Sequence, residues 1–221
     1  LRFVSNLARL RRVPLKQQWN IHYNDDIDWY ALERFHDGLR QFKDARGLYD
    51  FTDMLELCVE KGLAPKLEVM FVDEAPDLSP LQWELVQLLA KNSKRIYIAG
   101  DDDQAIFRWA GADVEHLVGI SRDNARVLEK SYRIPQSVHR IANQVISRVK
   151  TRTEKVWEPR SEEGQVISQA SFEHVDVSSG EWMFLSRTNY MLNEIEAHCR
   201  GLGVYFERKG NPSISDKKIK S

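Results

Sequence analysis

The sequence has little cysteine and no long apolar run. Its two cysteines, Cys58 and Cys199, lie far apart and form no CxxC or cysteine–histidine pattern. This spacing gives no zinc site and is typical of structural thiols in a reducing compartment. No apolar stretch approaches the roughly 18 residues of a membrane span, and no signal peptide is recognisable. We therefore expect a soluble cytoplasmic protein with no membrane segment.

The chain also lacks an excess of charge of either sign. Its 221 residues carry a formal net charge of −1, so no overall field argues for or against nucleic acid. An apolar content of 42% is enough for a core in one large or two small domains. Residues 1–20 contain basic residues and no acid, which predicts a basic patch or a solvated face. The basic residues are Arg2, Arg9, Arg11, Arg12 and Lys16.

Apolar residues at helical spacing predict two helices near the N-terminus. The first follows a start signal at Asn24 to Asp26, and its apolar residues are expected in the core rather than in a base-stacking platform. The second runs from about Phe51 to Lys61 and stops at Gly62. The apolar residues of the first helix are Trp29, Leu32, Phe35, Leu39 and Phe42.

Residues 67–109 hold the clearest pattern in the chain. Two short apolar runs, Leu67 to Val72 and Arg95 to Ala99, each end abruptly in acids. Such runs are typical of buried parallel strands. The segment between them is long enough for a crossover helix, with a clear start signal and an apolar stripe to cover the sheet. The start signal is Ser79, Pro80 and Gln82, and the stripe is Trp83, Val86 and Leu89.

Acidic residues follow both predicted strands. If the strands are parallel, Asp73 and Glu74 share one carboxyl edge with Asp101 to Asp103 and Gln104, where open α/β sheets bind ligands. An Asp-Glu pair after a strand is an arrangement that holds Mg²⁺ near a nucleotide and orients a water. The crowded carboxylates need a cation, hydrogen bonds or solvent, and Gln104 can bond a phosphate oxygen or a water. The phosphate-binding pattern GxxxxGK(S/T) does not occur in these residues.

The later part of the chain repeats an α/β pattern. Arg126 to Leu128 predicts a short strand, Pro135 opens a helix, and Lys150 to Gly164 predicts a linker or surface loop. A second sheet is expected beyond residue 164. The predicted buried stripe of the helix is Val138, Ile141, Ala142, Val145 and Val149. The predicted later elements are strands at Gln165 to Phe172, Trp182 to Ser186 and Val204 to Glu207, and a helix at Asn189 to Arg200.

Three longer segments of the chain form an ordered set of motifs: VDEAPDLSPLQ (72–82), IAGDDDQAIFRWAGA (98–112) and LEKSYRIPQSVHRIAN (128–143). These segments resemble motifs of the UvrD/Rep/PcrA-type superfamily 1 DNA helicases. LYDFTDML (48–55) is similar to the Asp-Phe-x-Asp-Leu-Leu element upstream of them, and residues 184–206 resemble the start of the second motor domain. The resemblance runs from about residue 47 to the end, and the first 46 residues match only loosely.

The resemblance implies an α/β fold with a RecA-like parallel sheet flanked by helices. Residues 1–46 would belong to a helical inserted subdomain, 47–125 to the first motor domain, and 126–221 to the start of the second. It implies an ATP-dependent translocase that uses ATP and Mg²⁺ on single-stranded DNA and at duplex junctions. The phosphate loop is expected before residue 1 and the last two motifs after residue 221, so the chain is expected to be an internal segment. Its oligomeric state stays open.

The resemblance also implies roles for individual residues. Asp73 would bind Mg²⁺, Glu74 would activate the attacking water, and Gln104 would sense the γ-phosphate. Tyr132 would stack on adenine, and Arg133 would act as an arginine finger.

Three residues that follow the acidic loop are predicted to touch DNA. Phe107 and Trp109 would contact single-stranded bases, with Arg108 offering a phosphate contact, although Trp109 packed between two domains is an alternative. The sequence departs from the family pattern at three positions. They are Pro76 in place of Gln, Ala110 in place of Arg, and Ser131 in place of Asn.

Two other classes of protein fit parts of the pattern. A non-hydrolytic DNA-binding or regulatory paralogue would keep Phe107, Trp109 and the basic N-terminus without a phosphate loop. A two-metal nuclease or phosphatase would use the carboxylates and leave Gln104, Tyr132 and Arg133 without a role.

Overall fold

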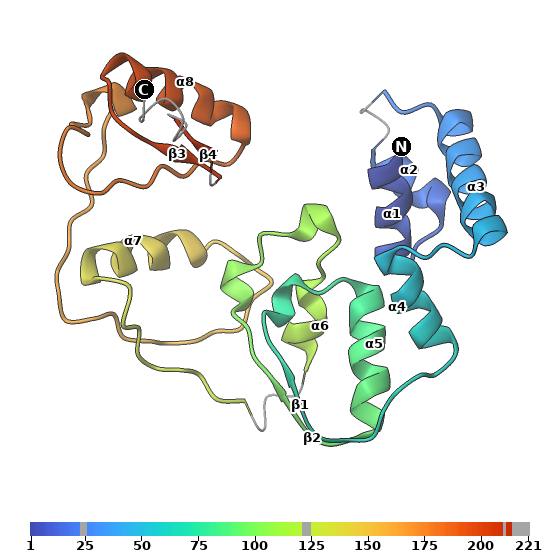
Figure 1. Cartoon of the computed structure of the whole chain (residues 1–221). Helices are drawn as coiled ribbons and strands as arrows, with labels where there is room; N and C mark the ends of the chain where they lie inside the picture. Colours follow the sequence, from blue (N-terminus) through green and yellow to red (C-terminus); the bar gives the residue numbers. More distant parts are fainter. Residues whose placement is uncertain (23–25, 121–124, 210, 214–221) are drawn as a thin grey trace, which may run out of the picture. The chain divides into compact units, whose positions relative to one another are not determined.

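The computed structural model describes residues 1–22, 26–120, 125–209 and 211–213. The chain forms two compact units, Leu1–Glu163 and Gly164–Ser221. Figure 1 shows their elements in chain order from blue to red. The boundaries after residues 46 and 125 stay predictions, because compactness alone does not mark an evolutionary domain.

Short helices form the N-terminal part of the first unit. α1 packs against α2, α3 and α4, and its buried Val4 and Leu7 form a small core with the fully buried Leu32 of α3. Leu32 thus confirms the predicted apolar stripe, whereas Phe42 is exposed at the far end of α3, where Arg46 covers one face of its ring. The helices are α1 (Arg2–Leu10), α2 (Leu15–Ile21), α3 (Trp29–Arg46) and α4 (Phe51–Glu60).

Helix α3 begins later than its predicted start signal. Asp28 is its N-cap, and the Asp28 side chain accepts a hydrogen bond from the Ala31 N–H at 2.7 Å. Gly47 ends the helix with φ 61°, a left-handed conformation that suits glycine. The cap therefore comes just after the predicted start signal at Asn24 to Asp26, of which residues 24 and 25 lie outside the described part of the chain.

Strands β1 (Leu67–Val72) and β2 (Ser93–Ile98) form a parallel pair, as predicted. Val72 lies opposite Ile98, so the two strands end at the same edge. Helix α5 (Pro80–Lys91) connects them and packs on both (Figure 1). Its predicted start is confirmed, because the Ser79 side chain caps the Gln82 N–H and the Gln82 side chain accepts from the Ser79 N–H at 2.8 Å.

Only one face of this small sheet is covered. Met70 is buried, whereas Phe71 is 76% exposed on the opposite face. The Phe71 ring stacks on Tyr97 of β2, with the ring centroids 5.1 Å apart. The prediction of strands buried on both faces is therefore wrong for this side of the sheet, because nothing in the described part of the chain packs on it.

A short turn, η1 (Ala75–Asp77), lies between β1 and α5. The segment after β2 contains η2 (Asp102–Gln104), η3 (Arg108–Ala110), α6 (Val114–Gly119) and α7 (Gln136–Ile146). The helix opened by Pro135 is confirmed, but its predicted buried stripe is wrong, since Ile141, Val145 and Val149 are exposed. The strand predicted at Arg126 to Leu128 is also wrong, because no neighbouring strand pairs with it within the described ranges.

The second unit contains less regular structure than predicted. The helix is confirmed as η5 (Asn189–Met191) followed by α8 (Leu192–Gly201). The turn η4 (Phe172–His174) and an antiparallel pair of two-residue strands, β3 (Glu207–Arg208) and β4 (Asn211–Pro212), complete the described elements. The strands predicted at residues 165–172 and 182–186 are wrong, and that at 204–207 reaches a strand only at Glu207.

The predicted second sheet is thus reduced to a small hairpin, because an apolar run forms a strand only where a neighbour completes its backbone hydrogen bonds. Among the described residues, no helix is long and apolar enough to cross a membrane.

Candidate functional site

The loops after β1 and β2 leave the sheet side by side. The Ala99 N–H donates to Val72 O at 2.7 Å, and the Ala75 N–H donates to Ala99 O at 3.0 Å, so the pairing continues past both strands. A Cβ atom on Gly100 would lie 2.3 Å from Pro76 Cδ, so only glycine fits there. Pro76 departs from the family pattern, yet it is buried and forms this close packing.

Asp73 and Glu74 lie in the first of these loops, and both are exposed. Glu74 has φ 49° and ψ 41°, a left-handed conformation that is costly for a residue with a side chain. Its N–H donates to Asp73 Oδ1 at 2.9 Å. The chain therefore turns sharply at Glu74, and both carboxylates are presented to solvent at the carboxyl edge of the sheet.

The three acids of the second loop are held by cations from this chain. Lys155 Nζ lies 2.7 Å from an Asp101 oxygen, 2.5 Å from an Asp102 oxygen and 3.2 Å from an Asp103 oxygen. Arg152 donates two hydrogen bonds to Asp103, at 2.8 and 2.9 Å. The crowded carboxylates are thus compensated by a lysine of this chain. Lys155 belongs to the segment predicted as a linker or surface loop, and this segment packs on the acidic loop.

These contacts set the charge of the loop. Burial raises the pKa of Asp101, but hydrogen bonds from Lys155 and Gln104 outweigh it and hold the pKa below its usual value. Burial likewise raises the pKa of Asp102, and the hydrogen bond from Lys155 reverses the shift. Burial lowers the pKa of Lys155, and its bonds to the two carboxylates raise the pKa overall. All three groups therefore stay charged near neutral pH.

Gln104 is attached to the same cluster. Its Nε2 donates to Asp101 Oδ2 at 2.6 Å, while the residue itself is exposed. Asp73, Glu74 and Gln104 thus gather at one edge of the sheet, as the sequence predicted.

Tyr132 and Arg133 lie on a turn before α7. Ser131 Oγ accepts hydrogen bonds from the Arg133 N–H at 3.3 Å and the Ile134 N–H at 3.1 Å. Serine thus organises this turn where the family pattern has asparagine. Both predicted side chains are exposed, and no hydrogen bond or ion pair in the described structure joins them to the other predicted site residues.

The predicted DNA-contacting aromatics belong to a larger exposed cluster. Trp109 is 65% exposed, and Phe107 is also exposed, with ring centroids 6.4 Å apart. The ring of Phe3 from α1 stacks on Trp109 at 6.3 Å and an interplanar angle of 28°. Arg108 lies between the two aromatics in the sequence with an exposed side chain, and its carbonyl accepts from Arg11 Nη2 at 2.8 Å. Sequence reasoning missed Phe3, whose only signal was an aromatic residue inside the basic stretch.

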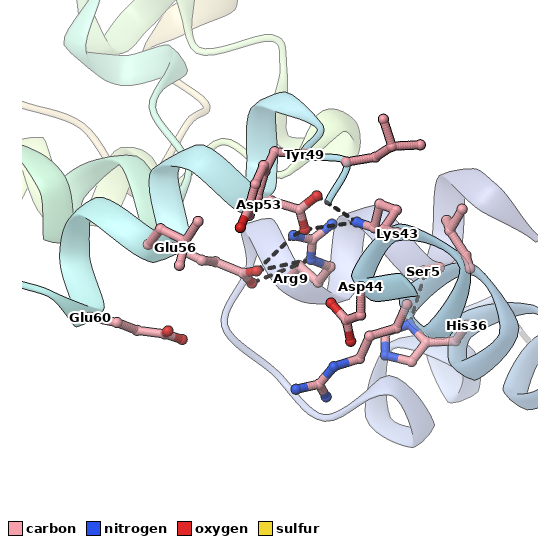
Figure 2. A pocket seen from close by; sticks show the side chains of 13 residues that line it. Ser5, Arg9, His36, Lys43, Asp44, Tyr49, Asp53, Glu56 and Glu60 are labelled. Atoms are coloured by element: carbon pink, nitrogen blue, oxygen red, sulfur yellow. Dashed lines mark hydrogen bonds and ion pairs between the residues drawn. The ribbon is translucent and has the colours of Figure 1, made fainter. Parts of the chain in front are cut away.

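The predicted basic patch at the N-terminus is wrong for two of its five residues, Arg9 and Arg12. Arg9 lies 2.5 Å from an Asp53 oxygen and 2.6 Å from a Glu56 oxygen of α4 (Figure 2). Arg9 also pairs with Asp50, the N-cap of α4. Arg12 pairs with Glu84 of α5 at 2.9 Å. These cations join the helices to each other instead of forming a surface for nucleic acid. Arg9 also borders a polar cavity of about 350 Å³ among α1, α3 and α4.

The Arg9 cluster predicts a dependence of stability on pH. Burial raises the pKa of Asp50, but bonds from the Asp53 N–H and Lys43, together with Arg9, lower it from 3.8 to about 2. Because the folded pKa is depressed, its stabilisation is present above about pH 4 and is lost as the pH falls toward 2. A shift of this size would be worth about 2.4 kcal/mol if buried. The Asp50 side chain is 35% exposed, so we expect about 1 kcal/mol.

Asp50→Asn tests this expectation, because asparagine still caps α4 while removing the charge. Urea unfolding should show the variant about 1 kcal/mol less stable than the unmodified chain near pH 6, with the difference shrinking toward about pH 3. A difference that stays constant over this range would show that the loss comes from the altered cap and not from the charge.

Comparison with known proteins identifies the class to which this site belongs. A family model described as the UvrD/REP helicase N-terminal domain matches residues 3–125, and the chain belongs to this family. The match begins at residue 3, so it includes the N-terminal helices, which carry none of the recognisable motifs.

Several similar proteins are ATP-dependent DNA helicases named PcrA. The chain is 33% identical to the ATP-dependent DNA helicase PcrA of Bacillus subtilis (strain 168) over 132 residues, covering 58% of this chain and 18% of that protein. It is 35% identical to PcrA of Staphylococcus aureus (strain Mu50 / ATCC 700699) over 97 residues, covering 42% of this chain and 13% of that protein. PcrA of Leuconostoc citreum is 32% identical over 140 residues, which cover 57% of this chain and 19% of that protein. The match thus spans less than one fifth of these relatives.

Proposed function

We propose that this chain is part of a RecA-like motor that hydrolyses ATP to move along single-stranded DNA and unwind duplex junctions. The observation that carries the proposal is the shared edge of the parallel strands, where Asp73 and Glu74 lie beside the loop that ends in Gln104. The exposed aromatic cluster follows this loop directly in the chain. A change at the nucleotide loop would therefore reach the DNA-contacting residues over a short span of backbone.

The residues at this edge suit a magnesium nucleotide. Asp73 offers an exposed carboxylate that forms no ion pair within the described structure, and Mg²⁺ at nucleotide sites takes one or two carboxylates together with phosphate oxygens and waters. When bound, Mg²⁺ neutralises charge that develops on the phosphates. Asp73 would hold the ion, and Glu74 would accept a proton from the attacking water.

The other predicted residues supply orientation and charge. Gln104 would hydrogen-bond the attacking water or the γ-phosphate, and Tyr132 would stack on adenine. Arg133 would bring a positive charge to the phosphate in the transition state.

Phosphate release measures the proposed activity directly. The 221 residues alone contain no GxxxxGK(S/T) loop. We therefore expect them to release phosphate from magnesium ATP no faster than buffer, because the developing charge lacks its main stabilisers. A protein that contains this chain and such a loop should release phosphate, and oligo-dT should stimulate the release. DNA-stimulated release by the chain alone, lost in Glu74→Gln, would contradict the first expectation.

The same assay separates the alternatives. A non-hydrolytic paralogue would bind oligo-dT but release no phosphate even with a phosphate loop present. The two-metal nuclease has less support, because Asp101, Asp102 and Asp103 are already paired with Lys155 and Arg152. Metal-dependent cleavage of DNA by the chain would support the nuclease alternative.

A further inference from the structure

One segment of the first unit touches both halves of the proposed nucleotide machinery. Residues 152–155 hold the acidic loop that ends in Gln104. A few residues later, the Ser131 N–H donates to Glu158 O at 2.8 Å, and the Arg160 N–H donates to Ile134 O at 2.9 Å. These bonds run along the turn that carries Tyr132 and Arg133. We call residues 152–163 the strap.

The anchor of the strap on the acidic loop is well shielded from water. The side chain of Lys155 is 12% exposed and that of Asp102 is 7% exposed. Ion pairs in such surroundings are screened much less than surface pairs, so their geometry is held firmly. The Thr153 N–H also donates to Asp102, which fixes the backbone of the strap as well as its side chains.

The Asp101 carboxylate joins Lys155 to Gln104. Lys155 Nζ lies 2.7 Å from Asp101 Oδ1, and Gln104 Nε2 lies 2.6 Å from Asp101 Oδ2. Each partner occupies a different oxygen of the carboxylate. An ionised carboxylate can only accept hydrogen bonds, so the Gln104 amide must turn its NH₂ group toward Asp101. Its carbonyl oxygen is thereby left to accept a bond from elsewhere.

We propose that Lys155 is a positioning residue for ATP hydrolysis, which keeps Asp101 in place and so presents the Gln104 carbonyl oxygen as the acceptor for the attacking water. The inference rests on the proposed function. In this role Lys155 acts on Gln104 through Asp101, to which its Nζ is paired. The strap also pairs with the turn before α7, but through backbone bonds at Glu158 and Arg160 that do not involve the Lys155 side chain.

The test uses Lys155→Met in a protein that contains this chain and a phosphate loop. We expect kcat for DNA-stimulated ATP hydrolysis to fall about 10- to 100-fold, as for a misplaced reacting group, with KM for ATP changed less than about threefold. Lys94→Met is the matched control, because Lys94 pairs with Glu68 at 2.8 Å on the exposed surface away from the loop. It should keep the full rate.

A double variant separates positioning from general destabilisation. Once Gln104 is alanine, Lys155 has no amide to orient, so Gln104→Ala with Lys155→Met should be no more than about twofold slower than Gln104→Ala alone. Losses that multiply would overturn the inference, and so would a full rate in Lys155→Met.

Asp101→Asn decides the question if Lys155→Met does not fold. It leaves Lys155 paired with Asp102 and Asp103, but its uncharged amide can also donate, so it no longer dictates the orientation of Gln104. We expect the same loss of kcat, and a full rate would overturn the inference. If the unmodified protein shows no DNA-stimulated hydrolysis, the proposed function fails and this inference fails with it. A normal rate of hydrolysis in the unmodified protein and in both variants would overturn the role of Lys155 and leave the proposed function standing.

Discussion

Replacing Arg133 by alanine, in a protein that contains this chain and a phosphate loop, should slow ATP hydrolysis by about 10³-fold, the low end for arginine fingers. Affinity for oligo-dT should stay nearly unchanged. The Arg133 side chain is not needed to stabilise its turn, because Ser131 Oγ and backbone bonds to the strap hold the turn in place. The side chain is therefore available for a functional role. The guanidinium is exposed and forms no ion pair within the described residues.

The control for this variant is Arg140→Ala. Arg140 lies nearby on α7, is also exposed, and pairs with Glu163. Removing it should leave both hydrolysis and DNA binding close to normal, because exposed ion pairs contribute little. Phosphate release and oligo-dT anisotropy measured on the same preparations give both quantities. Equal losses in hydrolysis and DNA binding for Arg133→Ala would mean that Arg133 is structural.

The parts of the fold that sequence predicted correctly are those fixed by local chemistry. Ser79, Pro80 and Gln82 define the start of α5 within a single turn, and short apolar runs that end in acids mark β1 and β2. The shared edge then follows from the parallel connection. Asp73, Glu74 and Gln104 could therefore be placed together from the sequence.

The errors about apolar residues share one physical cause. An apolar stripe indicates that a surface is favourable to bury, but it does not indicate whether the segment that would cover it lies within these 221 residues. Ile141 and Val145 of α7, and Phe71 on the open face of the sheet, have the pattern of buried residues and remain exposed. Residues 165–172 likewise have the pattern of a strand without a neighbour to pair with.

Charged pairs between distant residues were unpredictable for another reason. Lys155 and Asp102 are 53 positions apart, and no periodicity links them. The five basic residues near the N-terminus looked like one patch, but Arg9 and Arg12 turned out to join different helices. Composition gives the charge of a segment, whereas the partner of each charge depends on the tertiary fold.

Trp109→Ala should weaken binding of the chain to oligo-dT by about 1 to 3 kcal/mol, the usual value of one base stacked on an aromatic ring. The stacked pair of Trp109 and Phe3, with Phe107 beside them, offers successive apolar faces to bases on the exposed surface of the first unit. Arg108 would add a phosphate contact. Phe3→Ala should weaken binding in the same direction, which would establish a residue of α1 as part of the surface.

The stability of the same variant distinguishes a DNA surface from a core position. Replacing a tryptophan that is buried in the core by alanine lowers the free energy of unfolding by about 3 to 5 kcal/mol. With Trp109 65% exposed, we expect little change in melting temperature. Tyr30→Ala is the control, because Tyr30 is an exposed aromatic on α3 outside the cluster and should change neither binding nor melting. A large drop in melting temperature for Trp109→Ala, with unchanged affinity for oligo-dT, would show that the tryptophan supports the fold and that bases stack elsewhere.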